Sequence, residues 1–296
     1  MVKPGLTLHR LELFLAVLEA GGVGRAARAR HLSQPAVSEH LRGLGQHFGL
    51  PLFERAGRGV RPTAAARLLE PFARQVIGLL RGAQRAAEDL RGLRAGSVAI
   101  GASTTPGTYL LPPLLGRFRQ AHPGLAVTLR IGDTRDIEQW VAGGDIELGV
   151  TGEAPTPPGL LAERWVTDEL VVIVRRRHRL ARRRTVAPAA LAGEPYIARE
   201  QGSSTRAVAE RYLAQHGLTL VPVMELGSTE AIREAVAAGL GLAVVSRHAL
   251  RPGDRRVVPL RVAGRRWVRD LLLIRRAGAP LTPAVARLRE FLLGAR

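Results

Sequence analysis

The chain contains no cysteine, which excludes disulfide bonds, thiolate catalysis and cysteine-ligated zinc. It also lacks any apolar run near the roughly 20 residues that a membrane-spanning helix needs. The first 22 residues place charges between apolar residues and lack the apolar core and cleavage site of a signal peptide. We therefore expect a cytoplasmic protein with no membrane partner and no metal site.

Lysine is nearly absent as well, because Lys3 is the only lysine among 44 basic residues. Such a skew can follow genome composition as much as function. A net charge of +19 still favours a polyanionic partner, and nucleic acid is the first candidate. A chain of 296 residues is longer than one hydrophobic core usually supports, and 46% apolar content is typical of folded domains. We expect two or three domains.

Catalytic motifs are also missing. We find no HExxH, GxSxG or Walker sequence, and no GxGxxG that follows a strand. The eight histidines are scattered, and acidic pairs such as Glu88-Asp89 fall on helix faces that we interpret as solvated. We predict that the protein is not an enzyme, with no catalytic residue and no cofactor. A transport protein that binds solutes is a further alternative, but it would need a signal peptide.

The first part of the chain is predicted to be helical. Thr7 is expected to cap a helix that ends at Gly21, and a short helix follows over residues 23–30. Ser33 is expected to cap a third helix that ends at Gly49. Two short helices followed by a capped one are typical of a helix-turn-helix, although an ordinary three-helix bundle would show the same pattern.

In a helix-turn-helix, the first residues of the second helix of the pair lie nearest the base edges. Gln34 can pair with adenine, Ser38 can contact a base or a phosphate, and Glu39 can accept a hydrogen bond from cytosine. We predict that the DNA contacts on this helix are Ser33, Gln34, Pro35, Ser38 and Glu39. Val37, Leu41 and Leu44 are expected to face the core.

A short hairpin with a glycine-bearing turn is predicted over residues 52–62. Arg55, Arg58 and Arg61 recur every three residues around its glycines. This spacing suits a wing that lies along DNA phosphates, and we predict all three as DNA contacts. The alternative is a solvated basic turn.

Thr63 is expected to cap a long helix that runs to about Leu93. Apolar residues follow one another at steps of three and four, as in a coiled coil, at Leu69, Phe72, Val76, Leu79, Ala83, Ala86, Leu90 and Leu93. Such a stripe needs a partner, which is either the rest of this chain or the same helix of a second chain. Pairing of two chains would place two reading helices on the half-sites of a palindrome.

From Ser97 onward strand-like and helical segments alternate, which predicts an α/β fold with open, mostly parallel sheets, two of them here. Hydroxyl side chains gather where strands give way to helices, in the segments 103–107, 151–152, 200–206 and 227–230. Free N–H groups and hydroxyls at helix N-termini attract anions. The alternative is that each serine or threonine caps its own helix and does nothing more.

Residues 11–62 resemble the N-terminal domain of LysR-type transcriptional regulators. The matching features are Phe14, Gly21, Ala26-Ala27, the run from Leu32 to Ser38, the run from Leu50 to Arg55, and Pro62-Thr63. The resemblance implies that Gln34, Pro35 and Ser38 contact bases or backbone and that Arg55 contacts a phosphate. It also implies a homodimer through the long helix, assembly into a homotetramer, and RNA polymerase as a further candidate partner.

The sequence departs from the family pattern in three places. Glu39 stands where the family has arginine, glutamine or a similar group. Gly43-Leu44-Gly45 replaces the common Arg-Leu-Glu. The small polar residues usual near Gly22 and Gly24 are absent, which weakens the cap of the second helix.

The second half resembles the effector domain of the same family, with two lobes like those of periplasmic binding proteins. The implied divisions are a winged helix-turn-helix over 1–62, a linker helix over 63–94 and an effector domain over 95–296. Lobe I would hold 96–164 and 267–296, and lobe II would hold 165–266. Ser103, Thr105, Thr151 and Ser204 match effector-contact positions of the family, and their neighbours Thr104, Thr134, Ser203 and Thr205 are added to the predicted set.

Residues 200–206 and 227–241 resemble the branch of the family that controls carbon-fixation or sulfur-assimilation genes. That resemblance implies an oxyanion or a phosphorylated metabolite as effector. Together these observations predict a sequence-specific regulator that binds double-stranded DNA at a palindromic promoter site. Its activity would change when a small anion binds between the two lobes.

Overall fold

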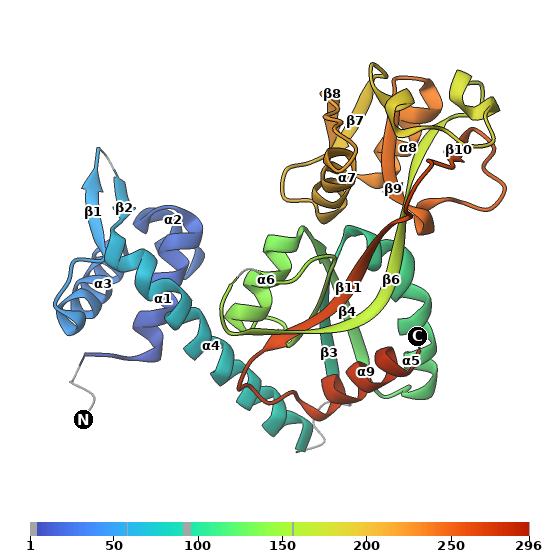
Figure 1. Ribbon diagram of the computed structural model, residues 1–296. Coiled ribbons are helices and arrows are strands. Elements are labelled where there is room, and N and C mark those ends of the chain that lie inside the picture. The colour runs from blue at the N-terminus through green and yellow to red at the C-terminus, as the bar shows by residue number, and fades with distance from the viewer. Residues whose placement is uncertain (1–4, 58, 91–95, 156, 296) are drawn as a thin grey trace. The chain divides into compact units, whose positions relative to one another are not determined.

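The computed structural model describes residues 5–57, 59–90, 96–155 and 157–295. They form two compact units, one with the N-terminal helices and hairpin and one with a large mixed sheet (Figure 1). The predicted contact Arg58 and the predicted stripe residue Leu93 lie outside the described residues. No helix in the described ranges is long and apolar enough to cross a membrane.

The first unit has the predicted order of elements: α1 (Leu8–Ala20), α2 (Val23–Ala29), α3 (Gln34–Phe48), β1 (Phe53–Ala56), β2 (Gly59–Pro62) and α4 (Ala64–Leu90). The three predicted caps are confirmed. Thr7 accepts a hydrogen bond from the N–H of Arg10 at 3.2 Å, and Ser33 accepts one from that of Ala36 at 3.3 Å. Thr63 accepts one from the N–H of Ala66 at 3.2 Å. As the sequence indicated, α2 has no side-chain cap.

The core of this unit lies among α1, α2, α3 and the first part of α4. Phe14, Val37 and Leu44 are fully buried, and Leu41 is nearly so, which confirms the predicted inner face of α3. Ala66 and Ile77 extend this core along one side of α4. The first half of the long helix is therefore anchored on the core of the first unit.

The predicted stripe lies on a different side of α4. Phe72 is 59% exposed, Val76 42% and Leu79 46%, although all three are large and apolar. Leu69 is the exception, since it packs partly against the core of its own unit. Pro71 lies inside the helix without ending it. The first unit thus leaves an apolar stripe on α4 exposed, formed by Phe72, Val76 and Leu79.

The second unit contains strands and helices in alternation. Its strands are β3 (Ser97–Ser103), β4 (Ala126–Gly132), β5 (Leu148–Thr151), β6 (Leu160–Arg175), β7 (Tyr196–Arg199), β8 (Pro222–Leu226), β9 (Leu242–Ser246), β10 (Val257–Leu260) and β11 (Trp267–Arg276). Its α-helices are α5 (Leu111–Ala121), α6 (Thr134–Gly143), α7 (Ser204–Ala214), α8 (Thr229–Ala238) and α9 (Pro283–Gly294). A π-helical turn over Pro106–Leu110 leads into α5.

Within the described residues, these strands form one nine-stranded sheet, which corrects the expectation of two separate sheets. The order is β4-β3-β5-β11-β6-β9-β7-β8, and β10 pairs with β6. The outer strands pair in parallel as predicted, whereas β6 and β11 are antiparallel to each other and to their other neighbours. The two long antiparallel strands join the lobes, because each runs through both (Figure 1).

Each lobe has helices on both faces of its part of the sheet, so each has a core on either side. In one lobe α5 and α9 cover one face and α6 the other. In the other lobe α7 and α8 take the two faces. This doubly wound arrangement brings the carboxyl ends of the parallel strands, and the helix N-termini after them, to the boundary between the lobes.

Sequence patterns missed the lengths of the connecting strands. For these two strands the apolar runs predict only the parts at 170–174 and 271–274, but β6 begins at Leu160 and β11 at Trp267. The missed parts mix apolar with charged residues, among them the buried Asp168 and Arg269, so no continuous apolar run marks them. The strand β10 was not predicted, since it is short and contains Pro259.

Candidate DNA-contact face and effector cleft

The N-terminal end of α3 exposes the residues predicted to contact DNA. Gln34, Pro35 and Glu39 are exposed, and the Ser33 hydroxyl serves as the helix cap. The amide of Gln34 lies beside Gly24 of α2, where a Cβ atom would come within 2.9 Å of its Nε2. Gly24 thus leaves room for the side chain proposed to read bases.

One residue on this face was missed by sequence reasoning. Gln34, Ser38 and Arg42 follow one another at intervals of four, so they lie on the same side of α3. Arg42 is exposed, whereas Ser38 is half-buried. The i, i+4, i+8 spacing was the signal that could have identified Arg42.

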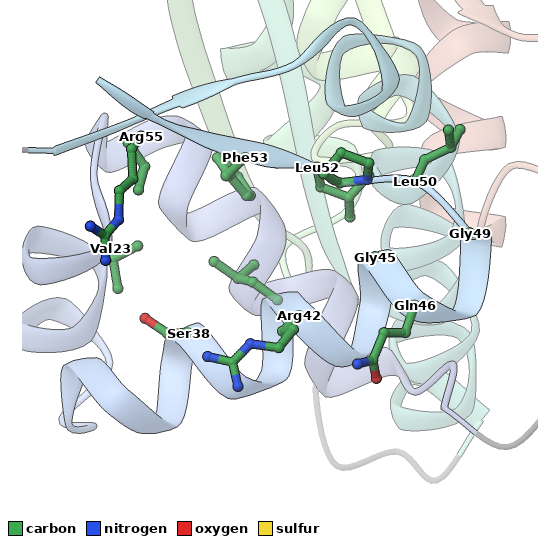
Figure 2. Close-up of a pocket in the computed structure, with 13 residues that line it drawn as sticks. Val23, Ser38, Arg42, Gly45, Gln46, Gly49, Leu50, Leu52, Phe53 and Arg55 are labelled. Carbon is green, nitrogen blue, oxygen red and sulfur yellow. The ribbon is translucent and has the colours of Figure 1, made fainter. Parts of the chain in front are cut away.

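A hollow of about 670 Å³ separates α3 from the hairpin. Its floor is apolar and includes Leu52, Phe53 and Val60. Ser38 and Arg42 lie along one side of this hollow, and Arg55 hangs from β1 on the other (Figure 2). Two guanidinium groups and a hydroxyl thus border one groove, an arrangement suited to a phosphate backbone.

Two glycines that depart from the family pattern shape the same helix. A Cβ atom at Gly45 would come within 2.9 Å of the carbonyl oxygen of Leu50, so the glycine allows the loop after α3 to approach closely. A Cβ atom at Gly43 would come within 2.8 Å of the guanidinium of Arg10. The departures at 43 and 45 therefore have local packing reasons.

The hairpin separates the arginines that the sequence grouped together. Glu54 is directly opposite Arg61, and Arg55 is opposite Val60. Because directly opposite residues share a face and neighbours alternate, Arg55 and Arg61 lie on opposite faces. Arg61 pairs with Glu54 at 2.9 Å, and both are exposed. Of these two arginines, Arg55 borders the hollow. Arg61 lies on the other face of the hairpin and stays a predicted DNA contact.

In the second unit, Arg269 of β11 occupies the boundary between the lobes. It is directly opposite Asp168 of β6, and its guanidinium contacts that carboxylate at 3.0 and 2.9 Å. Both side chains are almost completely buried. Burial lowers the pKa of Arg269, Asp168 opposes this shift, and the nearby Arg199 adds to it. Arg269 was absent from the predicted site.

Three of the predicted effector residues are hydrogen-bonded to this arginine. Its Nη1 donates to the hydroxyls of Ser204 at 2.8 Å and Thr205 at 3.0 Å, both at the start of α7. Its Nη2 donates to the hydroxyl of Thr105 at 3.1 Å. Since Thr105 comes from the other lobe, one buried cation joins the two lobes through hydroxyls.

A second buried arginine lies in the same cleft. Arg199, at the end of β7, is 4% exposed and contacts the carboxylate of Glu200 at 2.6 and 2.7 Å. It also donates to the hydroxyl of Thr229 at 3.0 Å and to that of Thr104 at 3.4 Å. Arg199 was missed too, although it directly precedes the predicted segment 200–206.

The hydrogen bonds count against simple helix capping. Thr105 and Ser203 precede helical segments, yet neither side chain caps one. Thr134 Oγ1 is buried and has no partner among the described residues. Thr151 instead donates to the carbonyl oxygen of Glu153 at 3.0 Å. Ser228, in the segment 227–230, does cap its own helix, since it accepts a hydrogen bond from the N–H of Ala231 at 3.4 Å. Simple capping therefore holds for Ser228 but not for Thr105 or Ser203.

The cleft brings together all but one of the predicted effector residues. It is lined by Ser103, Thr104, Thr105, Thr134, Ser203, Ser204 and Thr205, together with Asp133, Arg199 and Glu200. The enclosed volume is about 10 Å³, and a second hollow of about 240 Å³ adjoins it at Thr134 and Ser203. Thr151 is buried but does not line the cleft. Glu153 lies on the adjoining hollow. Burial raises the pKa of its carboxyl group, and the charges of Arg211 and Arg269 oppose this shift.

A winged helix-turn-helix with a long exposed linker stripe, joined in one chain to a two-lobed domain with a cationic cleft, defines a ligand-responsive DNA-binding protein. Residues 8–67 match the family described as "Bacterial regulatory helix-turn-helix protein, lysR family". Residues 91–296 match the family described as "LysR substrate binding domain". The chain therefore belongs to the LysR family of DNA-binding transcriptional regulators, and it is not an enzyme.

Known proteins similar to this chain include both regulators and solved structures. The chain is 37% identical over 290 residues to the RuBisCO operon transcriptional regulator of Allochromatium vinosum, covering 97% of this chain and 96% of that protein. The regulatory domain of CcmR from Synechocystis PCC6803 in complex with 2-PG matches with a TM-score of 0.64 and 30% identity. That match covers 68% of this chain and 97% of the other. The LysR family regulator CbnR shares the fold, with a TM-score of 0.69 and 23% identity over 97% of this chain and 98% of that one.

Proposed function

We propose that this LysR-type regulator controls carbon-fixation genes and responds to a small phosphorylated or oxyanionic metabolite bound between its two lobes. The observation that carries the proposal is a cleft lined by hydroxyls and by the buried Arg199. A second buried arginine, Arg269, is hydrogen-bonded to three of the lining hydroxyls. Guanidinium groups hydrogen-bond to phosphate and carboxylate in a bidentate manner, and a buried cation favours an anionic partner. The relative named as a RuBisCO operon regulator supports the carbon-fixation branch over sulfur assimilation.

The effector would replace protein contacts rather than fill free space. The cleft volume of about 10 Å³ is at the lower limit of what is needed to hold one water molecule. An anion could enter if the hydroxyls of Ser204, Thr205 and Thr105 exchanged Arg269 for the ligand, with Thr134 Oγ1 as an unused partner. Because Thr105 and Ser204 come from different lobes, this exchange would change how the lobes are held together.

For DNA we propose base contacts by Gln34 and Ser38 and phosphate contacts by Arg55 and Arg42. Ser33, Pro35, Glu39, Arg58 and Arg61 stay in the predicted set of DNA contacts. The backbone of one strand would enter the hollow between α3 and the hairpin, between the two arginines. The proposed domain and lobe divisions are those implied by the family resemblance, and the proposed location is the cytoplasm.

We propose a homodimer formed through the stripe on α4, since Phe72, Val76 and Leu79 are apolar and exposed. A second apolar surface lies at an edge of the sheet, where β8 exposes Val223 and Met224. An exposed edge strand is suited to self-association. Two such surfaces would allow a dimer of dimers on a palindromic promoter, with RNA polymerase as a further candidate partner.

The test of the effector is thermal unfolding of the full chain with 2-PG, inorganic phosphate and neutral glycerol. A ligand at 100 times its Kd stabilises by about 2.7 kcal/mol, which is a shift of a few degrees in a protein of this size. We expect a shift with 2-PG or phosphate and none with glycerol. Thr134→Val should weaken the shift, whereas Thr128→Val, an exposed threonine of β4, should leave it unchanged. An equal response of both variants would place the anion elsewhere.

A further inference from the structure

An arginine-rich segment between β6 and β7 takes no part in the DNA-contact face or the effector cleft. Residues 175–184 hold seven arginines and no acidic residue. Runs of this kind are usually solvated and carry no function. Within the described residues, Arg179 is the one arginine of this run that pairs with a carboxylate, and the fold places a further arginine, Arg261, beside the run.

The segment is held in a defined shape. Leu180, within a short helical turn over Arg179–Arg182, is fully buried, and so is Val186 after the turn. His178 accepts a hydrogen bond from the N–H of Leu180 at 3.2 Å through Nδ1. The guanidinium groups are therefore presented from a fixed frame, which lowers the entropy lost when they bind.

A second stretch of chain is tied to the first. The N–H of Arg176 donates to the carbonyl oxygen of Arg256 at 2.8 Å, and the N–H of Val186 donates to that of Arg261 at 2.8 Å. The two stretches together carry six exposed arginines, which we call the arginine surface: Arg176, Arg177, Arg182, Arg183, Arg184 and Arg261.

None of these six arginines has a carboxylate partner among the described residues. The neighbouring acidic groups are already paired, Glu194 with Arg179 and Asp254 with Arg256 and Arg233. Elsewhere in the same lobe arginines are matched, as Arg206 is by Glu210 and Glu225. Six arginines without a carboxylate partner thus come together on two hydrogen-bonded stretches of the lobe.

The composition of the surface distinguishes between polyanionic partners. In the described segments 175–186 and 255–266 no large apolar side chain is exposed. Stable protein interfaces bury aromatic or aliphatic anchors, and this surface offers none. Phosphate backbones need only cations and hydrogen-bond donors, and arginine presents its donors in a planar fork that matches phosphate.

We propose that the arginine surface is a second, sequence-independent binding site for the sugar-phosphate backbone of duplex DNA. It lies in the effector domain and is separate from the helix-turn-helix. It would bind DNA of any sequence, for example the flanks of an operator already held by the N-terminal unit. Its contribution should appear as salt-dependent affinity.

The test uses the full chain and a random-sequence 60-bp duplex, and it measures Kd over a range of salt concentrations. Removing two phosphate contacts should make the slope of log affinity against log salt less steep by up to about two. We expect this for Arg183→Gln/Arg184→Gln and near-normal slopes for Arg183→Lys/Arg184→Lys, which keeps both charges. The matched control is Arg119→Gln/Arg287→Gln, which removes two exposed arginines of α5 and α9.

An unchanged slope in Arg183→Gln/Arg184→Gln would overturn the proposal. An equal decrease in the control pair would also overturn it, because the effect would then come from net charge and not from this surface. If DNA binding were normal but activation by purified RNA polymerase were lost, the surface would belong to an acidic protein partner and the DNA assignment would be wrong.

Discussion

Arg269 and Asp168 are directly opposite each other on the two long antiparallel strands that connect the lobes, and their side chains form a doubly contacted ion pair at 3.0 and 2.9 Å. Ser246 donates to the other carboxylate oxygen at 2.6 Å. The pair lies where the strands pass from one lobe to the other, and the same guanidinium contacts hydroxyls of both lobes. The connection between the lobes and the candidate effector site therefore share one residue.

Breaking this pair should strongly destabilise the effector domain. Arg269→Met leaves the Asp168 carboxylate buried without its cation, a change that costs about 3–5 kcal/mol in comparable buried pairs. The double variant with Asp168→Asn should recover part of that loss, since the uncompensated charge is gone. Urea unfolding of the full chain measures both. The control is Arg211→Met, which removes an exposed pair with Glu153 and should cost less than about 1 kcal/mol. A loss for Arg269→Met no larger than the control's would show that the pair is not structurally important.

Alkaline pH should destabilise the protein through Tyr196. Burial raises the pKa of this buried phenol to about 12, with Glu210 adding to the shift and Arg206 opposing it. The folded state thus prefers the neutral form, so the stabilisation is complete below the unfolded pKa near 10 and is lost as pH rises to about 12. The expected loss is about 2–3 kcal/mol. Tyr196→Phe removes the group, and its urea midpoint should fall less than that of the wild type between pH 10 and 12. Parallel pH curves for the two proteins would contradict the assignment.

The DNA-contact face makes separate predictions for base and phosphate contacts. Gln34→Ala should weaken binding to the cognate site by about 1–3 kcal/mol and leave binding to random duplex nearly intact. Arg42→Gln and Arg55→Gln should each lower the salt slope by about one on both DNAs. Fluorescence anisotropy with an operator selected from random duplexes measures both quantities. Equal losses on both DNAs for Gln34→Ala would argue against base reading, and an unchanged slope for Arg42→Gln would remove it from the phosphate contacts.

The α4 stripe predicts how the chains associate. Phe72→Glu/Val76→Glu places charges on an apolar contact and should shift the protein toward monomer in sedimentation velocity. Arg67→Glu is the control, because Arg67 is exposed on α4 but outside the stripe. As the dimer is lost and the sedimenting mass decreases, cooperative binding to a palindromic site should decrease as well. An unchanged sedimentation coefficient would mean that α4 does not form the dimer.

Local patterns determined the DNA-binding unit almost completely. The caps Thr7, Ser33 and Thr63 and the buried face of α3 follow from spacing within one or two helical turns, and the structure confirms them. The hydroxyl segments of the effector domain were also found from sequence, because they occur where the pattern changes from strand to helix. These are short-range features, and a short window of sequence contains all the information that fixes them.

Only the tertiary structure decided which of these residues act together. The hairpin register turned Arg55 toward α3 and Arg61 away from it, although their spacing grouped them. The pairing of β6 with β11 brought Arg269 to Asp168 across 101 positions of the chain. No local pattern marks a buried arginine whose partner is so distant, since its burial depends on the strand that covers it. The sequence by itself thus determined the family, the helices and the hydroxyls, whereas long-range strand pairing decided where the cleft's positive charge lies.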